Sequence, residues 1–77
     1  MRSLTVISDV DTITEKFGPE VKPLVVKVRA MHYFRINRVD AEKYQLKYQK
    51  KRLPELKTLK ELKIPDGAQL YLEKTSK

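Results

Sequence analysis

The sequence contains no cysteine and only one histidine, His32. Without cysteine the chain cannot form disulfides or zinc–thiolate sites. Small secreted domains usually depend on such cross-links, so we expect an intracellular protein, cytoplasmic or nuclear. The sequence also lacks any apolar run close to the ~20 residues of a membrane-spanning helix, and its first residues do not have the pattern of a signal peptide.

The residues that nucleophilic catalysis requires are not arranged in any motif. A serine nucleophile needs a base, an orienting group and an oxyanion donor, which together form a recognisable constellation. Ser3, Ser8 and Ser76 have no such neighbours in the sequence, and His32 is expected on the surface of a helix. We therefore predict that the protein has no catalytic residues and is not an enzyme.

Phosphate-binding and metal-binding motifs are also missing. The only glycines, Gly18 and Gly67, have the surroundings of turn residues and form no glycine-rich phosphate loop. Asp9 and Asp11 have the spacing that begins a calcium loop, but the glycine and the distal glutamate of such a loop are absent. The chemistry of a hairpin turn explains this pair better, and we predict neither a metal nor a cofactor.

The 77 residues form one predicted domain, 1–77, either complete or excised from a longer protein.

The sequence is rich in positive charge, with a net charge of +7. Residues 1–43 hold eight Lys/Arg and six Asp/Glu, whereas residues 44–77 hold nine and four. Such a surface favours an anionic partner, namely nucleic acid, a membrane leaflet or an acidic protein face, although basic residues also serve solubility alone.

The N-terminal half has the pattern of a hairpin followed by one helix. Residues 3–8 are rich in β-branched side chains and residues 12–17 alternate loosely, which predicts two strands joined by a short turn. Gly18-Pro19 interrupts the pattern. From Pro23 onward apolar residues recur at helical spacing, with the proline in the first turn. Because three valines weaken this helix, a strand over residues 24–29 is the alternative.

The C-terminal half contains two further predicted strands. Residues 44–49 alternate after a polar loop, although their composition also allows a helix over residues 41–52. Pro65-Asp66-Gly67 is a predicted turn, in which proline fixes φ and glycine tolerates a positive φ. Residues 68–74 then alternate cleanly, which is the strongest strand pattern in the sequence.

Residues 44–74 resemble the C-terminal half of ubiquitin-like domains. The order of motifs is the same: a strand alternating leucine and an aromatic residue, Thr58-Leu59 ahead of an isoleucine, an acidic turn with glycine, and a final Leu-x-Leu strand. The positions that this family buries correspond here to Leu46, Leu53, Leu59, Ile64, Leu70 and Leu72. The resemblance implies an α+β fold, the ubiquitin-like β-grasp, with a mixed four- to five-stranded sheet packed on one helix.

A narrower resemblance concerns the N-terminal half. Lys22-Pro23-Leu24 is similar to the step that opens the helix in Ras-binding members of this superfold, such as the N-terminal domain of ELMO-type engulfment proteins. Those members use their second strand and first helix to meet the acidic switch region of a GTP-loaded small GTPase. The resemblance implies a partner-binding set made of Lys16, Lys22, Lys27 and Arg29.

Two departures from ubiquitin limit what the resemblance implies. The sequence ends in residues 73–77 without the Gly-Gly of conjugated modifiers, so we expect a domain that is not conjugated. Lys47 and Glu73 fall where the apolar recognition patch of ubiquitin has its central isoleucine and its C-terminal valine. A partner that buries an aliphatic patch would meet unpaired charges there, which is unfavourable. We therefore expect no binding to ubiquitin receptors.

The densest basic cluster supports a second hypothesis. It comprises Lys47, Lys50, Lys51 and Arg52, with Tyr44, Tyr48 and Tyr71 as candidates for exposed rings beside it. Basic side chains beside aromatic rings suit a nucleic-acid backbone and its bases, whereas a solvated turn is the simpler interpretation. No known nucleic-acid-binding signature accompanies the cluster.

The apolar positions of the predicted elements give a predicted core. It comprises Leu4, Val6, Ile13, Leu24, Val28, Met31, Leu46, Leu53, Leu59, Ile64, Leu70 and Leu72. With no catalytic motif and a basic surface, the sequence indicates a protein-interaction module whose partner has an acidic face, such as a GTP-loaded small GTPase. A module that binds RNA or DNA is the alternative.

Overall fold

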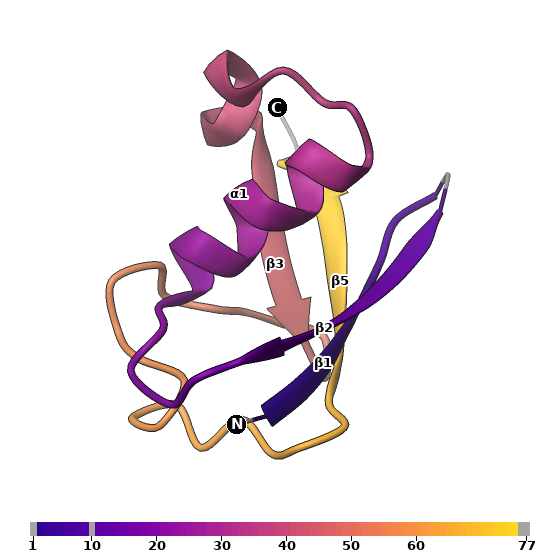
Figure 1. The fold of residues 1–77 in the computed structure, drawn as a ribbon. Coiled ribbons are helices and arrows are strands. Elements are labelled where there is room, and N and C mark those ends of the chain that lie inside the picture. Colours follow the sequence, from indigo (N-terminus) through magenta and orange to yellow (C-terminus); the bar gives the residue numbers. More distant parts are fainter. Residues whose placement is uncertain (1, 10, 76–77) are drawn as a thin grey trace.

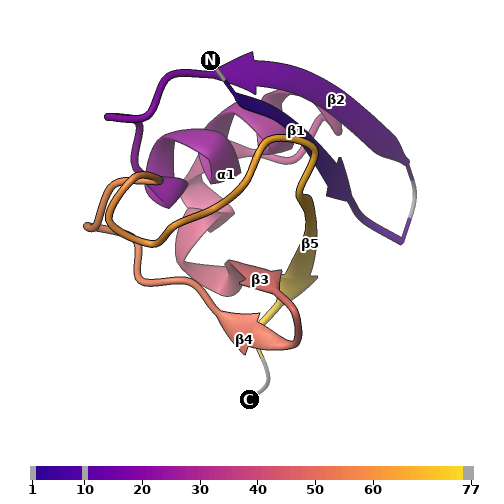
Figure 2. The same ribbon diagram turned by 90° about the horizontal axis from the view of Figure 1, so that it is seen from below.

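A five-stranded mixed sheet packs against one α-helix in the computed structural model, which describes residues 2–9 and 11–75 (Figure 1). The elements are β1 (Arg2–Ile7), β2 (Thr12–Phe17), α1 (Pro23–Tyr33), the 3₁₀ helix η1 (Arg38–Lys43), β3 (Tyr44–Tyr48), β4 (Lys51–Arg52) and β5 (Gln69–Lys74). The strand order is β2-β1-β5-β3-β4, which Figure 2 shows from below. The expected α+β architecture is thus confirmed.

The N-terminal hairpin forms as predicted. β1 and β2 are antiparallel, with Val6 opposite Ile13. The hairpin turn is held by Ser8 and Asp11: the Ser8 N–H donates to the Asp11 carbonyl at 2.8 Å, and the Asp11 N–H donates to Ser8 Oγ at 3.1 Å. These bonds agree with a turn role for Asp11. Val10 and Ser76 lie outside the described residues.

β5 occupies the middle of the sheet and joins its two ends. It pairs in parallel with β1, where Val6 lies opposite Leu70, and antiparallel with β3, where Leu46 lies opposite Leu72. The turn before β5 is the predicted one: Gly67 has φ +84°, and the Asp66 carboxylate accepts the Ser3 N–H at 2.6 Å. The turn residues therefore also fasten the start of β1 beside β5.

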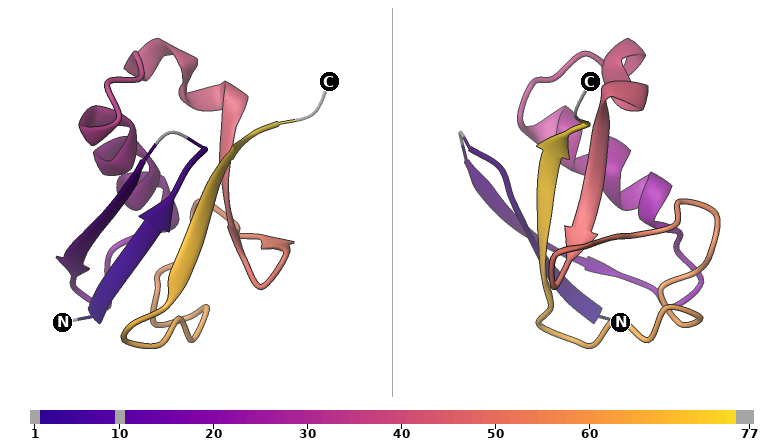
Figure 3. Two further views of the ribbon diagram at one scale, coloured as in Figure 1. Left: turned by 90° about the vertical axis from the view of Figure 1, so that its right-hand side faces the viewer. Right: turned by 180° about the vertical axis from the view of Figure 1, so that it is seen from behind.

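The helix lies entirely on one side of the sheet (Figure 3) and buries a face that differs from the predicted one. Its buried residues are Pro23, Val26, Lys27, Ala30 and Met31. The prediction that Leu24 and Val28 are core residues is wrong, since both are only half-buried. The unbroken apolar run from Leu24 to Val26 does not define a face, so packing decides the rotation of the helix. Ala30, fully buried, allows a close approach to the sheet.

Two alternatives from the sequence are excluded by the observed elements. Residues 24–29 belong to α1 and not to a strand, and the helix considered over 41–52 does not form, because β3 pairs with β5 along most of its length. Where a polar loop was expected, the chain forms η1. Asn37 precedes η1, and its side-chain oxygen accepts the Val39 N–H at 3.1 Å, an arrangement that asparagine commonly makes ahead of a turn.

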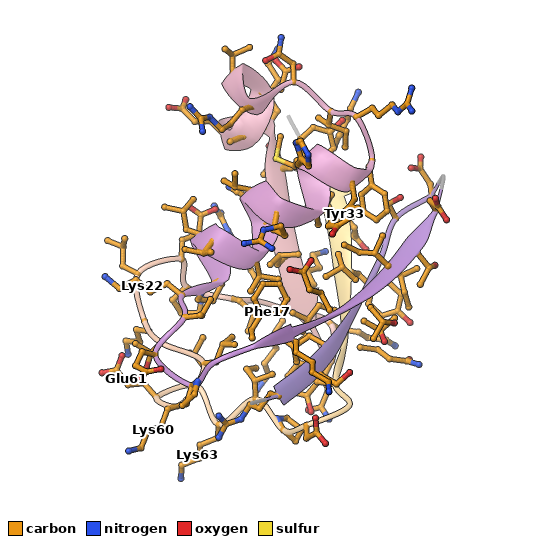
Figure 4. The ribbon with its side chains drawn as sticks, in the orientation of Figure 1. Phe17, Lys22, Tyr33, Lys60, Glu61 and Lys63 are labelled. Carbon is orange, nitrogen blue, oxygen red and sulfur yellow. The ribbon has the colours of Figure 1, made fainter. Side chains whose placement is uncertain are left out.

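The core lies between α1 and the inner face of the sheet. Its buried apolar residues are Leu4, Val6, Phe17, Val26, Ala30, Met31, Leu46, Leu53, Leu59, Ile64, Ala68, Leu70 and Leu72. Nine of the twelve predicted core residues are in this set, and Ile13 packs against it half-buried. Phe17, which closes the space under the helix, is visible in Figure 4.

Candidate protein-interaction surfaces

Lys27 was predicted to contact a partner, but it is buried, with 2% of its surface exposed. Its ammonium group donates to the Ala41 carbonyl at 2.8 Å and to the Tyr44 carbonyl at 3.2 Å, and it forms an ion pair with the Glu55 carboxylate. A buried ammonium is tolerated only when its donors are satisfied in this way. The expectation that Lys27 lies on the exposed side of the helix is therefore wrong: it ties α1 to η1, β3 and residue 55.

Arg29 remains at the surface but already has a partner. Its guanidinium donates to the carboxylate of Glu15 on β2, which spans the gap between strand and helix. The Arg29 side chain is 49% exposed and that of Glu15 is 23% exposed. Among the described residues, Glu15 Oε1 is buried without a hydrogen-bond partner. Successive residues of a strand point to opposite faces, so this bridge leaves Lys16 on the outer face of the sheet.

Lys16 and Lys22 are both exposed, but they do not lie together. Lys16 is on β2 and has no ion-pair partner within the described ranges. Lys22 precedes α1 and lies near the loop that carries Glu61, because its charge is one of the influences on that carboxyl. The four residues predicted as one partner-binding set thus lie in four different places. Lys27 is in a buried contact, Arg29 in the ion pair between β2 and α1, Lys16 on the outer face of the sheet and Lys22 at the start of the helix.

The loop over residues 57–63 lies against the segment that precedes α1. The Thr58 N–H donates to Glu61 Oε1 at 2.9 Å and the Glu61 N–H donates to Thr58 Oγ1 at 3.1 Å. The Thr58 N–H lowers the pKa of Glu61, with smaller help from the Thr58 hydroxyl, Lys57 and Lys22. The Leu59 N–H donates to the Val21 carbonyl at 2.9 Å, which holds the loop against the segment before α1. In Figure 4, Glu61 lies between Lys22, near the start of the helix, and Lys60 and Lys63 at the bottom of the view.

The tip between β3 and β4 is the other basic surface. Lys50, Lys51 and Arg52 are exposed, and none has an ion-pair partner in the part of the chain that the structure describes. Gln49 and Lys50 have φ of +53° and +69°, so two non-glycine residues form the left-handed turn at the tip. Three residues of the predicted cluster, 50–52, therefore lie on one solvent-facing hairpin, whereas the fourth, Lys47, is paired with Glu73 on β5.

The aromatic residues near this tip are only partly as expected. Tyr71 is 42% exposed and lies opposite Lys47, which in turn lies opposite Arg52. Tyr44 and Tyr48, expected as exposed rings, are half-buried and pack against the core. One ring, that of Tyr71, therefore stands beside the basic hairpin.

The outer face of β3 and β5 carries an ion pair where ubiquitin has an apolar patch. Lys47 Nζ lies 3.1 Å from a Glu73 carboxylate oxygen, with side chains 32% and 49% exposed. The two charges that were expected to be unpaired toward a partner thus neutralise each other. A partner that buries aliphatic side chains on this face would have to desolvate the pair, which is unfavourable.

The remaining features of the described residues concern metal binding, the histidine and membrane spans. Within 2–9 and 11–75, no group of three acidic or histidine side chains could hold a metal ion. His32 is exposed on the helix, as expected, and makes an edge contact with Tyr33 at a ring-centroid distance of 6.1 Å. In the same part of the chain, no helix is long and apolar enough to cross a membrane.

Comparison with known proteins shows the fold. No family model and no curated protein matches the sequence. Among solved structures, the ubiquitin of Caldiarchaeum subterraneum superposes with a TM-score of 0.84 at 15% identity, covering 99% of this chain and 95% of that one. The fold is ubiquitin-like. A designed protein based on ubiquitin matches this ubiquitin-like fold with a TM-score of 0.83 at 18% identity, covering 99% of this chain and 90% of that one.

The ubiquitin-like fold also occurs inside a longer chain. A structure of ATBAG1 in complex with HSP70 matches with a TM-score of 0.82 at 14% identity, covering 96% of this chain but 40% of that one. At such identities the similarity establishes the architecture of this chain and not its partner.

Proposed function

We propose that this ubiquitin-like domain is a non-catalytic protein-interaction module that binds an acidic partner along the outer edge of β2. The observation that carries the proposal is the position of β2 at the end of the strand order, where no described strand pairs with its outer edge. An unpaired edge presents backbone N–H and C=O groups that can add a strand from a partner. β2 pairs in regular register with β1 along all six residues, so no bulge interrupts the strand to which a partner would add.

The charges beside this edge favour an acidic partner. Lys16 projects from β2 without an ion-pair partner in the described ranges, and Arg29 stands half-exposed over the β2–α1 gap. Opposite charge accelerates association and selects among partners. A GTP-loaded small GTPase fits this chemistry, in line with the resemblance of Lys22-Pro23-Leu24 to Ras-binding members of the superfold. The ATBAG1 complex with HSP70 supports a role for this fold within protein assemblies.

Charge reversal at Lys16 tests the proposal. In an NMR titration of the labelled domain with small GTPases, we expect shifts confined to residues 12–29, and only with the GTP-analogue form. Lys16→Glu should weaken this binding by about tenfold, because a repelled charge at the edge replaces an attracted one. Lys50→Glu with Lys51→Glu is the matched control and should bind as the wild type does. Equal shifts with the GDP form, or shifts outside β2 and α1, would contradict the proposal.

The hairpin between β3 and β4 supports a second candidate function, binding of single-stranded nucleic acid. The supporting observation is three exposed basic residues, 50–52, near the exposed ring of Tyr71. Phosphates would contact the basic side chains while a base stacks on the ring. In a fluorescence titration with a short single-stranded RNA, Lys50→Glu with Lys51→Glu should abolish binding and Lys16→Glu should not. Binding that does not weaken as salt is raised would exclude this interpretation.

A further inference from the structure

The exposed side of α1 borders an apolar groove at the surface, outside the core. The groove has a volume of about 440 Å³ and lies between the helix and the segment that follows it. It is lined by Val25, Val28, Met31 and Ile36, with Arg29, His32 and Arg38 around them. Met31 belongs to the buried core and Ile36 packs against it, whereas Val25 and Val28 are in neither set.

The valines in this groove stabilise neither the helix nor the core to any large extent. Val25 is 46% exposed, and Val28 and Ile36 are half-buried. Valine is a poorer helix former than alanine or leucine, because its branched side chain loses χ1 freedom against the preceding turn. At a solvent-facing helix position, a valine side chain also lacks most of the free energy that burial would supply. Val25 and Val28 would be buried further only if another molecule covered the groove.

The charges around the groove are of one sign. No acidic residue lines it, and α1 itself contains none. Arg38 is exposed and has no ion-pair partner within 2–9 and 11–75. Arg29 gives one donor to Glu15 while staying half-exposed, and a guanidinium carries five donors in all. Both arginines can therefore bind carboxylates of a molecule seated between them.

We propose that this groove binds a peptide segment of a partner protein in which an aliphatic side chain is flanked by carboxylates. The aliphatic side chain packs against Val25, Val28 and Ile36, and the carboxylates bind Arg38 and Arg29. A nucleic acid is a poorer match, because His32 supplies the one ring of the lining and the aliphatic side chains have no counterpart on a phosphate backbone. The surface shares only Arg29 with the β2 edge, so the two can be tested separately.

Peptide selection tests this inference. A library of random 12-residue peptides is displayed on phage and panned on the whole domain. The probe variant is Val25→Ser with Arg38→Glu, which changes two exposed residues and leaves the core intact. We expect the selected peptides to contain an aliphatic residue beside Asp or Glu. Measured by fluorescence anisotropy, they should bind the wild type about tenfold more tightly than this variant. Lys16→Glu should bind them as the wild type does.

Chemical-shift mapping of the strongest peptide then fixes the location. Shifts centred on residues 25, 28, 36 and 38 would support the proposal. It is overturned if no peptide is enriched, if the enriched peptides lack acidic residues, or if they bind the double variant as tightly as the wild type. Shifts confined to β2 would also overturn it, because the acidic segment would then be bound at the sheet edge.

Discussion

Replacing Lys27 with methionine should lower the free energy of unfolding by about 3 kcal/mol, because removing one partner of a buried ion pair leaves the others unsatisfied. Methionine keeps most of the length and packing of the aliphatic stem but has no donor. The carbonyls of Ala41 and Tyr44 would lose their hydrogen bonds. The Glu55 side chain is 32% exposed, so water can reach its carboxylate and the loss stays at the lower end of the usual range.

This loss is large for so small a domain, whose total stability we expect to be about 4–12 kcal/mol. Urea denaturation followed by circular dichroism measures it. Lys22→Met is the matched control: it removes the same charge from an exposed residue at the start of the same helix, and should change the stability by at most about 0.5 kcal/mol. If the two variants unfold at the same urea concentration, the contacts of the Lys27 ammonium make no net contribution to the free energy of unfolding, and the prediction is wrong.

Leu70→Ala should lower the free energy of unfolding by about 2–5 kcal/mol, the sum of lost burial and the cavity left behind. Leu70 is fully buried and lies opposite Val6 in the parallel pair of β1 and β5. The cavity would open where the two halves of the sheet meet under α1, and the residues around it belong to several elements. Little relaxation is therefore expected to fill it.

The same denaturation experiment checks this second prediction. Leu56→Ala is the control, since Leu56 is 73% exposed and its truncation removes an equal volume without a cavity. A cooperative transition for Leu70→Ala with an unchanged midpoint would contradict the placement of β5 in the centre of the sheet. A normal midpoint for the control, together with a lowered one for Leu70→Ala, would confirm it.

The sequence pattern predicted four of the five strands, because period-two alternation and β-branched residues are typical of a half-buried sheet. Residues 68–74 are the clearest case, and β5 covers Gln69–Lys74. The pattern did not predict β4, since Lys51 and Arg52 are both exposed and show no apolar alternation. The turn before β5 was predictable for a local reason, the need for positive φ at Gly67. The rotation of α1 was not predictable in this way. Val25, Val26 and Val28 are equally apolar, and only contact with the sheet decides which of them is buried.

The candidate site was less predictable than the fold, for reasons that Lys27 illustrates. Lysine is rarely buried, so a lysine on a basic helix is expected in solvent. Its burial depends on acceptors that lie far away in sequence, at residues 41, 44 and 55. The groove beside Val25 had no sequence signal except valines at exposed helix positions, which become meaningful only once the buried face is known.

The parallel pairing of β1 with β5 also constrains when the domain can fold. Thr5 on β1 lies opposite Gln69 on β5, so the parallel pair cannot form until the chain as far as β5 has been synthesised. Until β5 is available, the β1–β2 hairpin has no sheet to join, and an isolated hairpin is only marginally stable in water. Emergence of β5 therefore completes the sheet in one late step. Before that step, both edges of the β1–β2 hairpin lack a partner strand, and unpaired strand edges are prone to aggregation.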